Sequence, residues 1–153
     1  MESLPNRHLT TLTLDVDFGG TVPIGPVAGG RRGIAPVRGG RFVGERLSGS
    51  VRPGADWFIA RPNGDLAIDV RLTLDTDDGA VLYLAYAGTM RGRGDAMARF
   101  RKGEALAAQD YALHTVARFE GGGEKYAWLS DALVVGIGAQ TAGGPVYTLY
   151  EIG

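Results

Sequence analysis

The fold is decided by residues 66–75, Leu-Ala-Ile-Asp-Val-Arg-Leu-Thr-Leu-Asp, in which apolar and polar side chains alternate without a break. Leucine, isoleucine and valine occupy every even position, and the odd positions carry Ala, Asp, Arg, Thr and Asp. A period of two residues is typical of a β-strand with one buried face. The next four residues, Thr76-Asp77-Asp78-Gly79, have the composition of a hairpin turn, so we expect an antiparallel return strand over residues 80–88.

The rest of the chain repeats this design. Strands are predicted at residues 9–18, 41–51, 56–61, 111–119, 132–140 and 146–152, with a short one at 33–36 inside a long Gly/Pro-rich connection at 19–40. Pro62-Asn63-Gly64-Asp65 is typical of another hairpin turn. Residues 91–110 break the alternation, which predicts one short helix or lid-like excursion around 94–108. Eight to nine strands joined by short turns indicate an all-β fold, either a single antiparallel barrel over residues 1–153 or a sandwich, and we favour the barrel.

Composition removes several classes of function. The 153 residues include 16 basic and 17 acidic side chains, a net charge of −1 that gives no electrostatic case for binding nucleic acid or an anionic membrane. There is no cysteine, which excludes disulfides, thiol catalysis and thiolate metal sites. The two histidines, His8 and His114, lie far apart in the sequence, so we expect neither a metal nor another cofactor. No secretion signal or membrane span is recognisable, and a cytoplasmic protein is expected.

Asp56 and Trp57 are the first candidate site residues. They follow Pro53-Gly54, which places a carboxylate and a large indole just past a turn. An Asp in this position often caps local backbone amides. If Asp56 is instead buried beside the indole, its pKa rises and it can act as a general acid or base.

Asp69, Arg71 and His114 are further candidates. Asp69 and Arg71 share one face of the alternating strand, so they converge on a ligand if that face lines a barrel lumen, or form a solvated ion pair if it lies outside. His114 is either a structural strand histidine or a proton shuttle that faces a cavity. We predict that Asp56, Trp57 and Arg71 border one cavity, with Asp69 and His114 as the other catalytic candidates.

Aromatic and basic residues supply candidate substrate contacts. Tyrosines and tryptophans in strands or turns are either core residues or a stacking wall for an apolar ligand, and an arginine can hold a substrate carboxylate. The candidate substrate-binding residues are Arg41, Trp57, Arg71, Tyr83, Arg118, Tyr126 and Trp128, and Tyr86 and Tyr111 belong to the same aromatic group.

Five motifs in order also resemble a known bacterial and fungal family, domain of unknown function 3237 (UPF0311). They are Gly39-Gly40-Arg41-Phe42-Val43-Gly44, Pro53-Gly54-Ala55-Asp56-Trp57, Asp69-Val70-Arg71, Thr76-Asp77-Asp78-Gly79-Ala80, and Tyr126-Ala127-Trp128-Leu129 with Val135-Gly136-Ile137-Gly138. The resemblance extends from about Leu9 to Ile152. It implies a single-domain barrel of the calycin or allene-oxide-cyclase type, whose lumen can hold a small molecule. The family often has Tyr-Phe-Arg where this chain has Tyr111-Ala112-Leu113-His114. If that arginine contacts a ligand in relatives, either His114 substitutes for it here or the contact is lost.

The sequence thus predicts a small-molecule-binding barrel. Carboxylates, a histidine, arginines and tyrosines can transfer protons without a cofactor, which fits an isomerase, cyclase or lyase/hydratase acting on a small, partly apolar organic substrate. The alternatives are a non-catalytic, lipocalin-like carrier and a scaffold whose lumen is plugged. The expected partners are a ligand in the lumen and, in a homodimer or other homo-oligomer, further copies of the chain, with no nucleic acid and no membrane.

Overall fold

The computed structural model describes residues 2–153, and its strands belong to one antiparallel sheet. The strands are β1 (Asn6–Val16), β2 (Val22–Val27), β3 (Gly30–Val43), β4 (Gly49–Val51), β5 (Gly54–Asp56), β6 (Ile59–Ala60), β7 (Leu66–Thr76), β8 (Val81–Gly92), β9 (Tyr111–Gly121), β10 (Leu133–Thr141) and β11 (Gly144–Ile152).

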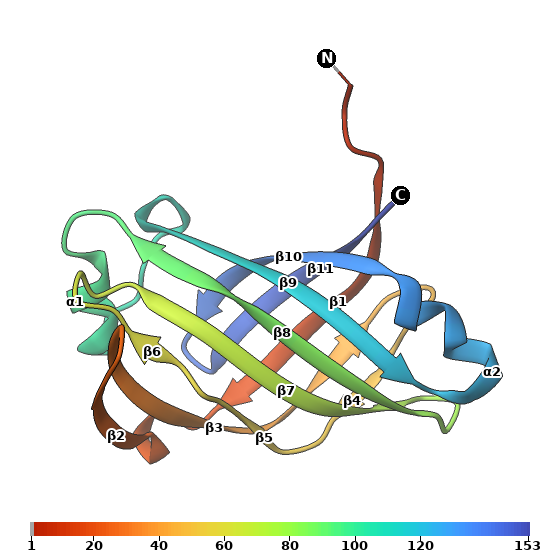
Figure 1. The fold of residues 1–153 in the computed structure, drawn as a ribbon, viewed down its shortest axis with the longest axis horizontal. Helices are drawn as coiled ribbons and strands as arrows, with labels where there is room; N and C mark the ends of the chain where they lie inside the picture. The colour runs from red at the N-terminus through yellow and green to blue at the C-terminus, as the bar shows by residue number, and fades with distance from the viewer. Residues whose placement is uncertain (1) are drawn as a thin grey trace.

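The sheet closes on itself as a barrel (Figure 1). Its strand order is β1-β11-β10-β9-β8-β7-β4-β3, and pairing of β1 with β3 completes the circle. Because β4, β5 and β6 each pair with both β3 and β7, they are successive segments of one interrupted strand of the barrel. The prediction of an antiparallel barrel is confirmed, and the sandwich is wrong.

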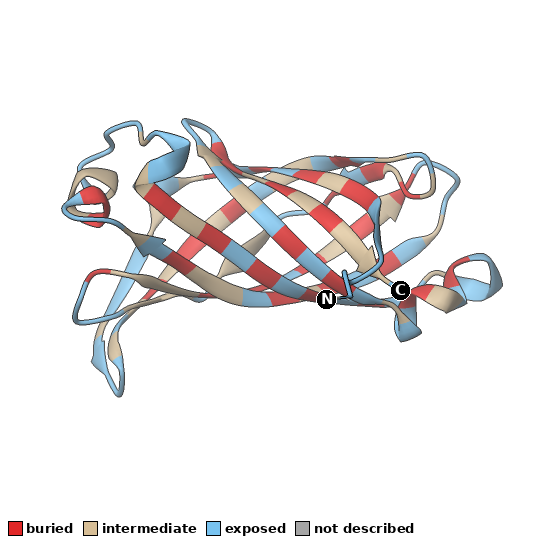
Figure 2. Cartoon of the chain, turned by 90° about the horizontal axis from the view of Figure 1, so that it is seen from above, coloured by how far each residue is buried: buried red, intermediate tan, exposed pale blue. Residues whose placement is uncertain are grey.

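Alternation along the strands fixes which residues face inward. On β7, Ile68, Val70, Leu72 and Leu74 are buried while Asp69 and Arg71 are exposed. The same alternation runs around the barrel in Figure 2. The inward side chains form one hydrophobic core, and the removal of their apolar surface from water is the main force that holds the barrel closed.

Short helices cover the two ends of the barrel. Helix α1 (Ala96–Arg101) lies over one end, and α2 (Gly123–Tyr126) with the 3₁₀ turn η3 (Ala127–Asp131) lies at the other (Figure 1). Two further 3₁₀ turns are η1 (Phe18–Gly20) and η2 (Ala108–Asp110). The expected excursion around 94–108 is confirmed. Among residues 2–153, no helix is long and apolar enough to cross a membrane.

The structure has the β2–β3 hairpin where a long connection was predicted at residues 19–40, and the short strand predicted at 33–36 is part of β3. Gly29, with φ of +90°, lies at the turn of this hairpin. Proline argues against a strand in sequence analysis because it has no backbone N–H to donate to a neighbouring strand. β2 nevertheless tolerates Pro23 and Pro26, because it is an edge strand with one neighbour.

Candidate functional site

The α1 end of the barrel contains a cavity of about 530 Å³. Its wall is mainly apolar. The lining residues are Leu14, Val16, Phe18, Thr21, Ala35, Val37, Asp56, Phe58, Ala60, Leu66, Ile68, Val70, Tyr86, Phe100, Arg101, Gly103, Glu104, Ala105, Leu106, Gln140, Thr141, Ala142, Pro145 and Tyr147. A concave apolar pocket with a few convergent polar groups is the usual form of a small-molecule site.

The cavity ends halfway down the barrel. On β7 the lining stops at Val70, and on β8 it stops at Tyr86. Beyond this level, Leu72 and Leu84 are buried but do not reach the cavity. Tyr147 is the corresponding limit on β11. Asp56 pairs with Val70 and lies at the same level, so a carboxyl and two phenols meet the floor of an otherwise apolar cavity.

The Asp56 side chain reaches the barrel lumen because the strand segments β5 and β6 are separated by a break. Strand β5 ends at Asp56, and β6 starts only at Ile59. At the break, the Trp57 N–H donates to the Asp69 carbonyl (2.9 Å), and the Asp69 N–H donates to Oδ1 of Asp56 (3.1 Å). The carboxylate therefore replaces a backbone acceptor in the ladder, which holds it against the wall while it lines the cavity.

Burial perturbs the titration of this group. Desolvation raises the pKa of Asp56 to about 7, the hydrogen bond from Asp69 opposes the rise, and the negative charge of Asp69 adds to it. Burial also raises the pKa of Tyr86 and of Tyr147, and the nearby Asp56 charge adds to both shifts. The two phenol rings meet edge-on, with centroids 5.1 Å apart. At neutral pH the site thus offers an acid/base carboxyl and two protonated phenols.

Two aromatic residues lie at the mouth of the cavity. Phe18 of η1 and Phe100 of α1 meet edge-to-face with centroids 6.1 Å apart. Arg101 and Glu104, on and just after α1, are exposed and are the charged residues of the lining besides Asp56. The charge at the mouth and the apolar wall inside favour a ligand whose buried part is neutral.

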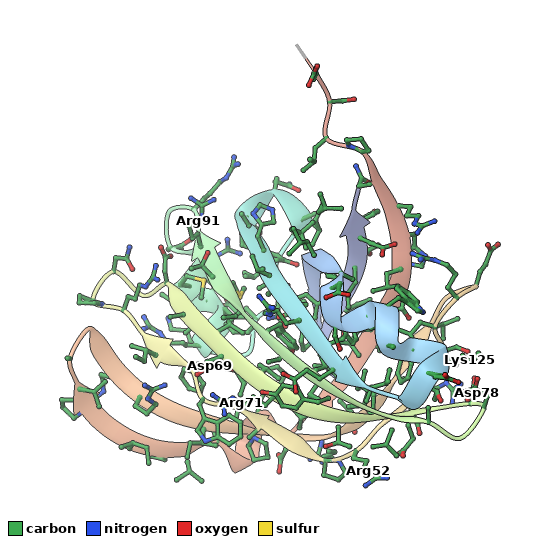
Figure 3. All side chains as sticks on the ribbon, turned by 45° about the vertical axis from the view of Figure 1, so that its right-hand side comes forward. Arg52, Asp69, Arg71, Asp78, Arg91 and Lys125 are labelled. Carbon is green, nitrogen blue, oxygen red and sulfur yellow. The ribbon has the colours of Figure 1, made fainter. Side chains whose placement is uncertain are left out.

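The other predicted catalytic residues do not line this cavity. Asp69 and Arg71 project from the outer surface of β7 (Figure 3). His114 is exposed on the outside of β9. The expectation that Arg71 borders a cavity with Asp56 is corrected by this placement, because the apolar residues of β7 take the inner face.

Most of the predicted substrate contacts are also outside. Trp57 is 38% exposed and does not line the cavity. Its carbonyl accepts a hydrogen bond from Arg32. The remaining outer-face candidates are Arg41 on β3, Tyr83 on β8 and Arg118 on β9. Each side chain points outward from its strand and alternates along the strand with inward-pointing core residues.

Tyr126 and Trp128 lie at the far end of the barrel. The Tyr126 hydroxyl donates to the Asp78 carboxylate at 2.8 and 2.9 Å, and Lys125 pairs with the same group. Figure 3 shows Asp78 and Lys125 side by side there. The guanidinium of Arg46 stacks on the Trp128 ring at 5.1 Å. These contacts hold α2 and η3 to the barrel end and do not reach the cavity.

Sequence reasoning missed Tyr147, and it placed Tyr86 only among the general aromatic residues. Both occupy inward positions of alternating strands, which is the signal that could have found them. Gln140, another lining residue, has a buried side-chain oxygen without a hydrogen-bond partner. Among residues 2–153, no three His, Cys, Asp or Glu side chains converge as metal ligands.

Known proteins are similar to this chain over nearly its whole length, both in sequence and in fold. A UPF0311 protein of Rhodopseudomonas palustris is 32% identical over 98% of this chain and 97% of its own length. A crystal structure from the same species, of a conserved protein of unknown function, superimposes with a TM-score of 0.90 at 33% identity over 99% of both chains.

More distant structures share the barrel. A β-barrel-like protein of Acinetobacter baumannii has a TM-score of 0.85 at 28% identity, over 100% of this chain and 98% of its own. An enzyme from Penicillium herquei has a TM-score of 0.73 at 15% identity, over 100% and 97%, a likeness of fold alone. The model of the family described as "Protein of unknown function (DUF3237)" matches residues 7–152, and the chain belongs to this family.

Proposed function

We propose that the protein is a cofactor-free acid/base enzyme that transfers a proton within a small, mainly apolar substrate held in the lumen. The observation that carries this proposal is the position of Asp56, the ionisable group at the floor of an apolar cavity, with its pKa raised to about 7. A general acid or base works best when its pKa lies near the working pH.

The chemistry follows from the neighbouring groups. Asp56 takes a proton from an activated carbon or a hydroxyl of the substrate and returns it at another position. Tyr86 and Tyr147 stay protonated, so they serve as donors to an oxygen on which negative charge develops. Isomerisation, cyclisation and elimination differ in which bond forms or breaks while the proton is away.

The cavity also defines the class of substrate. Its volume of about 530 Å³ suits one compact organic molecule, and its inner wall is hydrocarbon. No cationic side chain of the described lining lies inside the mouth, so a substrate carboxylate would meet Asp56 without a partner. The substrate part that enters is therefore uncharged. The barrel can carry catalysis, since the Penicillium herquei protein of this fold is described as an enzyme.

The test uses β-tetralone, a neutral bicyclic ketone with acidic α-protons. Exchange of these protons for deuterium is followed by proton NMR in D₂O near neutral pD. The wild-type protein should accelerate exchange by about 10²-fold or more over buffer, the usual contribution of a positioned general base. Asp56→Asn should abolish the acceleration, because the amide keeps the shape and the acceptor of the carboxyl but transfers no proton. Asp69→Asn, which changes the outer face of the same wall, should retain it.

The alternative is a carrier of a small hydrophobic ligand. The predominantly apolar lining favours it, because a carrier needs volume and hydrocarbon but no acid or base. Binding of β-tetralone without faster exchange, equal in the wild type and in Asp56→Asn, would support the carrier and contradict the enzyme. Exchange that survives in Asp56→Asn would remove Asp56 from the mechanism.

A further inference from the structure

The outer face of β8, β9 and β10 carries a cluster of exposed apolar side chains. Val116 and Leu133 are each 63% exposed, and Ile137 is 55% exposed. With Ala87, Thr89, His114 and Val135 they form a continuous patch, because the strand registers place Ala87 beside Val116 and Val116 beside Val135. We call these seven residues the β9 patch. It contains no Asp, Glu, Lys or Arg.

The adjoining strand β7 has an ordinary polar outer surface. The outward positions of β7 carry Asp69, Arg71 and Asp75, and Arg52 pairs with Asp75 at 2.7 Å. Other exposed apolar side chains occur on the β2–β3 hairpin, at Val22, Ile24 and Val27, but those lie on an edge strand outside the closed barrel wall. Large apolar side chains gathered on one face of the wall mark an interaction site. The barrel does not need them there, because the inward side chains of the same strands already supply the core.

We propose that the β9 patch is the interface of a homodimer, in which the patches of two copies pack face to face. Two identical surfaces can meet about a two-fold axis only if they do not repel each other, and a patch without charged residues satisfies this condition. A partner selected by charge would find nothing in the patch to pair with.

The shape and size of the patch also suit a second copy. A shallow hollow of about 380 Å³ lies between His114 and Val116 on one strand and Val135 and Ile137 on the next. The exposed valine and isoleucine side chains beside it are the projections that the hollow of a twin patch can receive. The patch itself covers three strands over about five residues, from Leu133 to Ile137 on β10, so it spans about 14 Å by 17 Å, or roughly 240 Å², from standard strand spacings. A stable interface buries about 800 Å² on each partner, so the patch is its apolar centre, and the outward residues around it, Arg118 of β9 among them, form its polar rim.

The geometry is that of two packed sheets. Antiparallel sheets stack about 10 Å apart with their strands inclined by about 30°, and apolar side chains interdigitate between them. In this arrangement the two cavities keep separate mouths, because the patch lies on the barrel side and α1 lies at one end. The dimer therefore neither completes nor blocks the proposed active site.

The first test is the mass in solution, measured by light scattering on a sizing column at about 100 µM. The wild type should have twice the chain mass of 16.1 kDa. Val116→Lys, which buries two like charges at the axis, should halve the mass to that of one chain with an unchanged far-ultraviolet circular dichroism spectrum. Val43→Lys is the matched control, since Val43 is 58% exposed on β3, outside the patch, and this variant should remain dimeric. A monomeric wild type, or a dimer that persists in Val116→Lys, would overturn the proposal.

A second test does not depend on destabilising the interface. The natural chain has no cysteine, so a single introduced thiol reports on one position. With a short bis-maleimide cross-linker, Val116→Cys at the proposed axis should form a covalent dimer at micromolar protein, whereas Val43→Cys should stay monomeric in a denaturing gel. Equal cross-linking of the two variants, or none from Val116→Cys, would show that the patch does not meet its own copy and would leave another partner as its occupant.

Discussion

Asp56 and Asp69 are joined through the barrel wall: the Asp69 backbone N–H donates a hydrogen bond of 3.1 Å to Oδ1 of Asp56. The Asp56 carboxyl lines the cavity, and the Asp69 side chain is exposed on the outer surface. Two acids that the sequence presents as equivalent candidates thus have different environments. One is desolvated and held by the backbone of the other.

This difference predicts how stability depends on pH. The pKa of Asp56 is about 7 in the folded protein and near its ordinary 3.8 in the unfolded chain, so the folded state binds the proton more tightly. Below about pH 4 both states are protonated and the group costs nothing. Between about pH 4 and 7 the Asp56 carboxyl is ionised in the unfolded chain but still protonated in the folded protein, so the free energy of unfolding falls as pH rises. Above pH 7 the carboxyl is ionised in both states, and the folded state contains a buried charge. The wild type should therefore lose up to about 4 kcal/mol across this range relative to Asp56→Asn.

The measurement is urea unfolding of the wild type and Asp56→Asn at a series of pH values. The difference between their unfolding free energies isolates Asp56, because the other groups are shared. It should grow in favour of the amide between about pH 4 and 7 and then level off. A difference that is constant with pH would contradict a raised Asp56 pKa.

The barrel was predictable because closed β-structure leaves a strong sequence signal. The strict alternation at residues 66–75 gave the buried face of β7 and, with its turn, the β7–β8 hairpin. The β2–β3 hairpin was missed because its residues are rich in glycine and proline, and edge pairing overrides their low strand propensity.

The site was only partly predictable for a related reason. Sequence places Asp56 beside Trp57, but it cannot show that the break between β5 and β6 turns the carboxyl inward and the indole outward. It also cannot show where side chains stop filling the lumen. Tyr86 and Tyr147 are aromatic residues at inward positions, as are many core residues, and only the level of the cavity floor distinguishes them.

Gly138 makes room for Tyr147, and its replacement should disturb the cavity floor. A Cβ added at Gly138 would lie 2.5 Å from Leu113 and 2.8 Å from the Tyr147 ring. We expect Gly138→Ala to lower the unfolding free energy by about 1–3 kcal/mol, the usual cost of overpacking. Gly143→Ala is the control, since nothing lies within 4 Å of its added Cβ. Equal denaturation midpoints for the two variants would contradict this packing.

Filling the cavity should weaken ligand binding without unfolding the barrel. Ala35 is 7% exposed and lines the cavity, so Ala35→Phe places a ring in the space a ligand needs. Isothermal titration with β-tetralone should show at least about a ten-fold loss of affinity, equivalent to about 1.4 kcal/mol. Ala85→Phe adds the same ring outside the lining and should leave affinity unchanged. Unchanged binding by Ala35→Phe would place the ligand elsewhere.

The Phe18–Phe100 contact should control how fast ligands enter and leave. The two rings join η1 to α1 across the mouth, edge-to-face at 6.1 Å, a geometry worth about 0.5–1.5 kcal/mol. Gly94 and Gly103 flank α1 with φ of +55° and +83°, so the backbone can bend on either side of the helix, although Ala96 and Met97 within it are buried. Loss of the contact should therefore raise the open population by about two- to ten-fold.

Phe100→Ala and Phe18→Ala should each accelerate both association and dissociation of β-tetralone, measured by stopped-flow quenching of intrinsic fluorescence. Because both rate constants rise, the equilibrium affinity should change less than either of them. The double variant should add little to the single ones, since either change already removes the same contact. Phe18→Tyr keeps a ring at the mouth and should retain the wild-type rates. Additive effects in the double variant, or rates unaltered in Phe100→Ala, would show that the two rings do not act together as the gate.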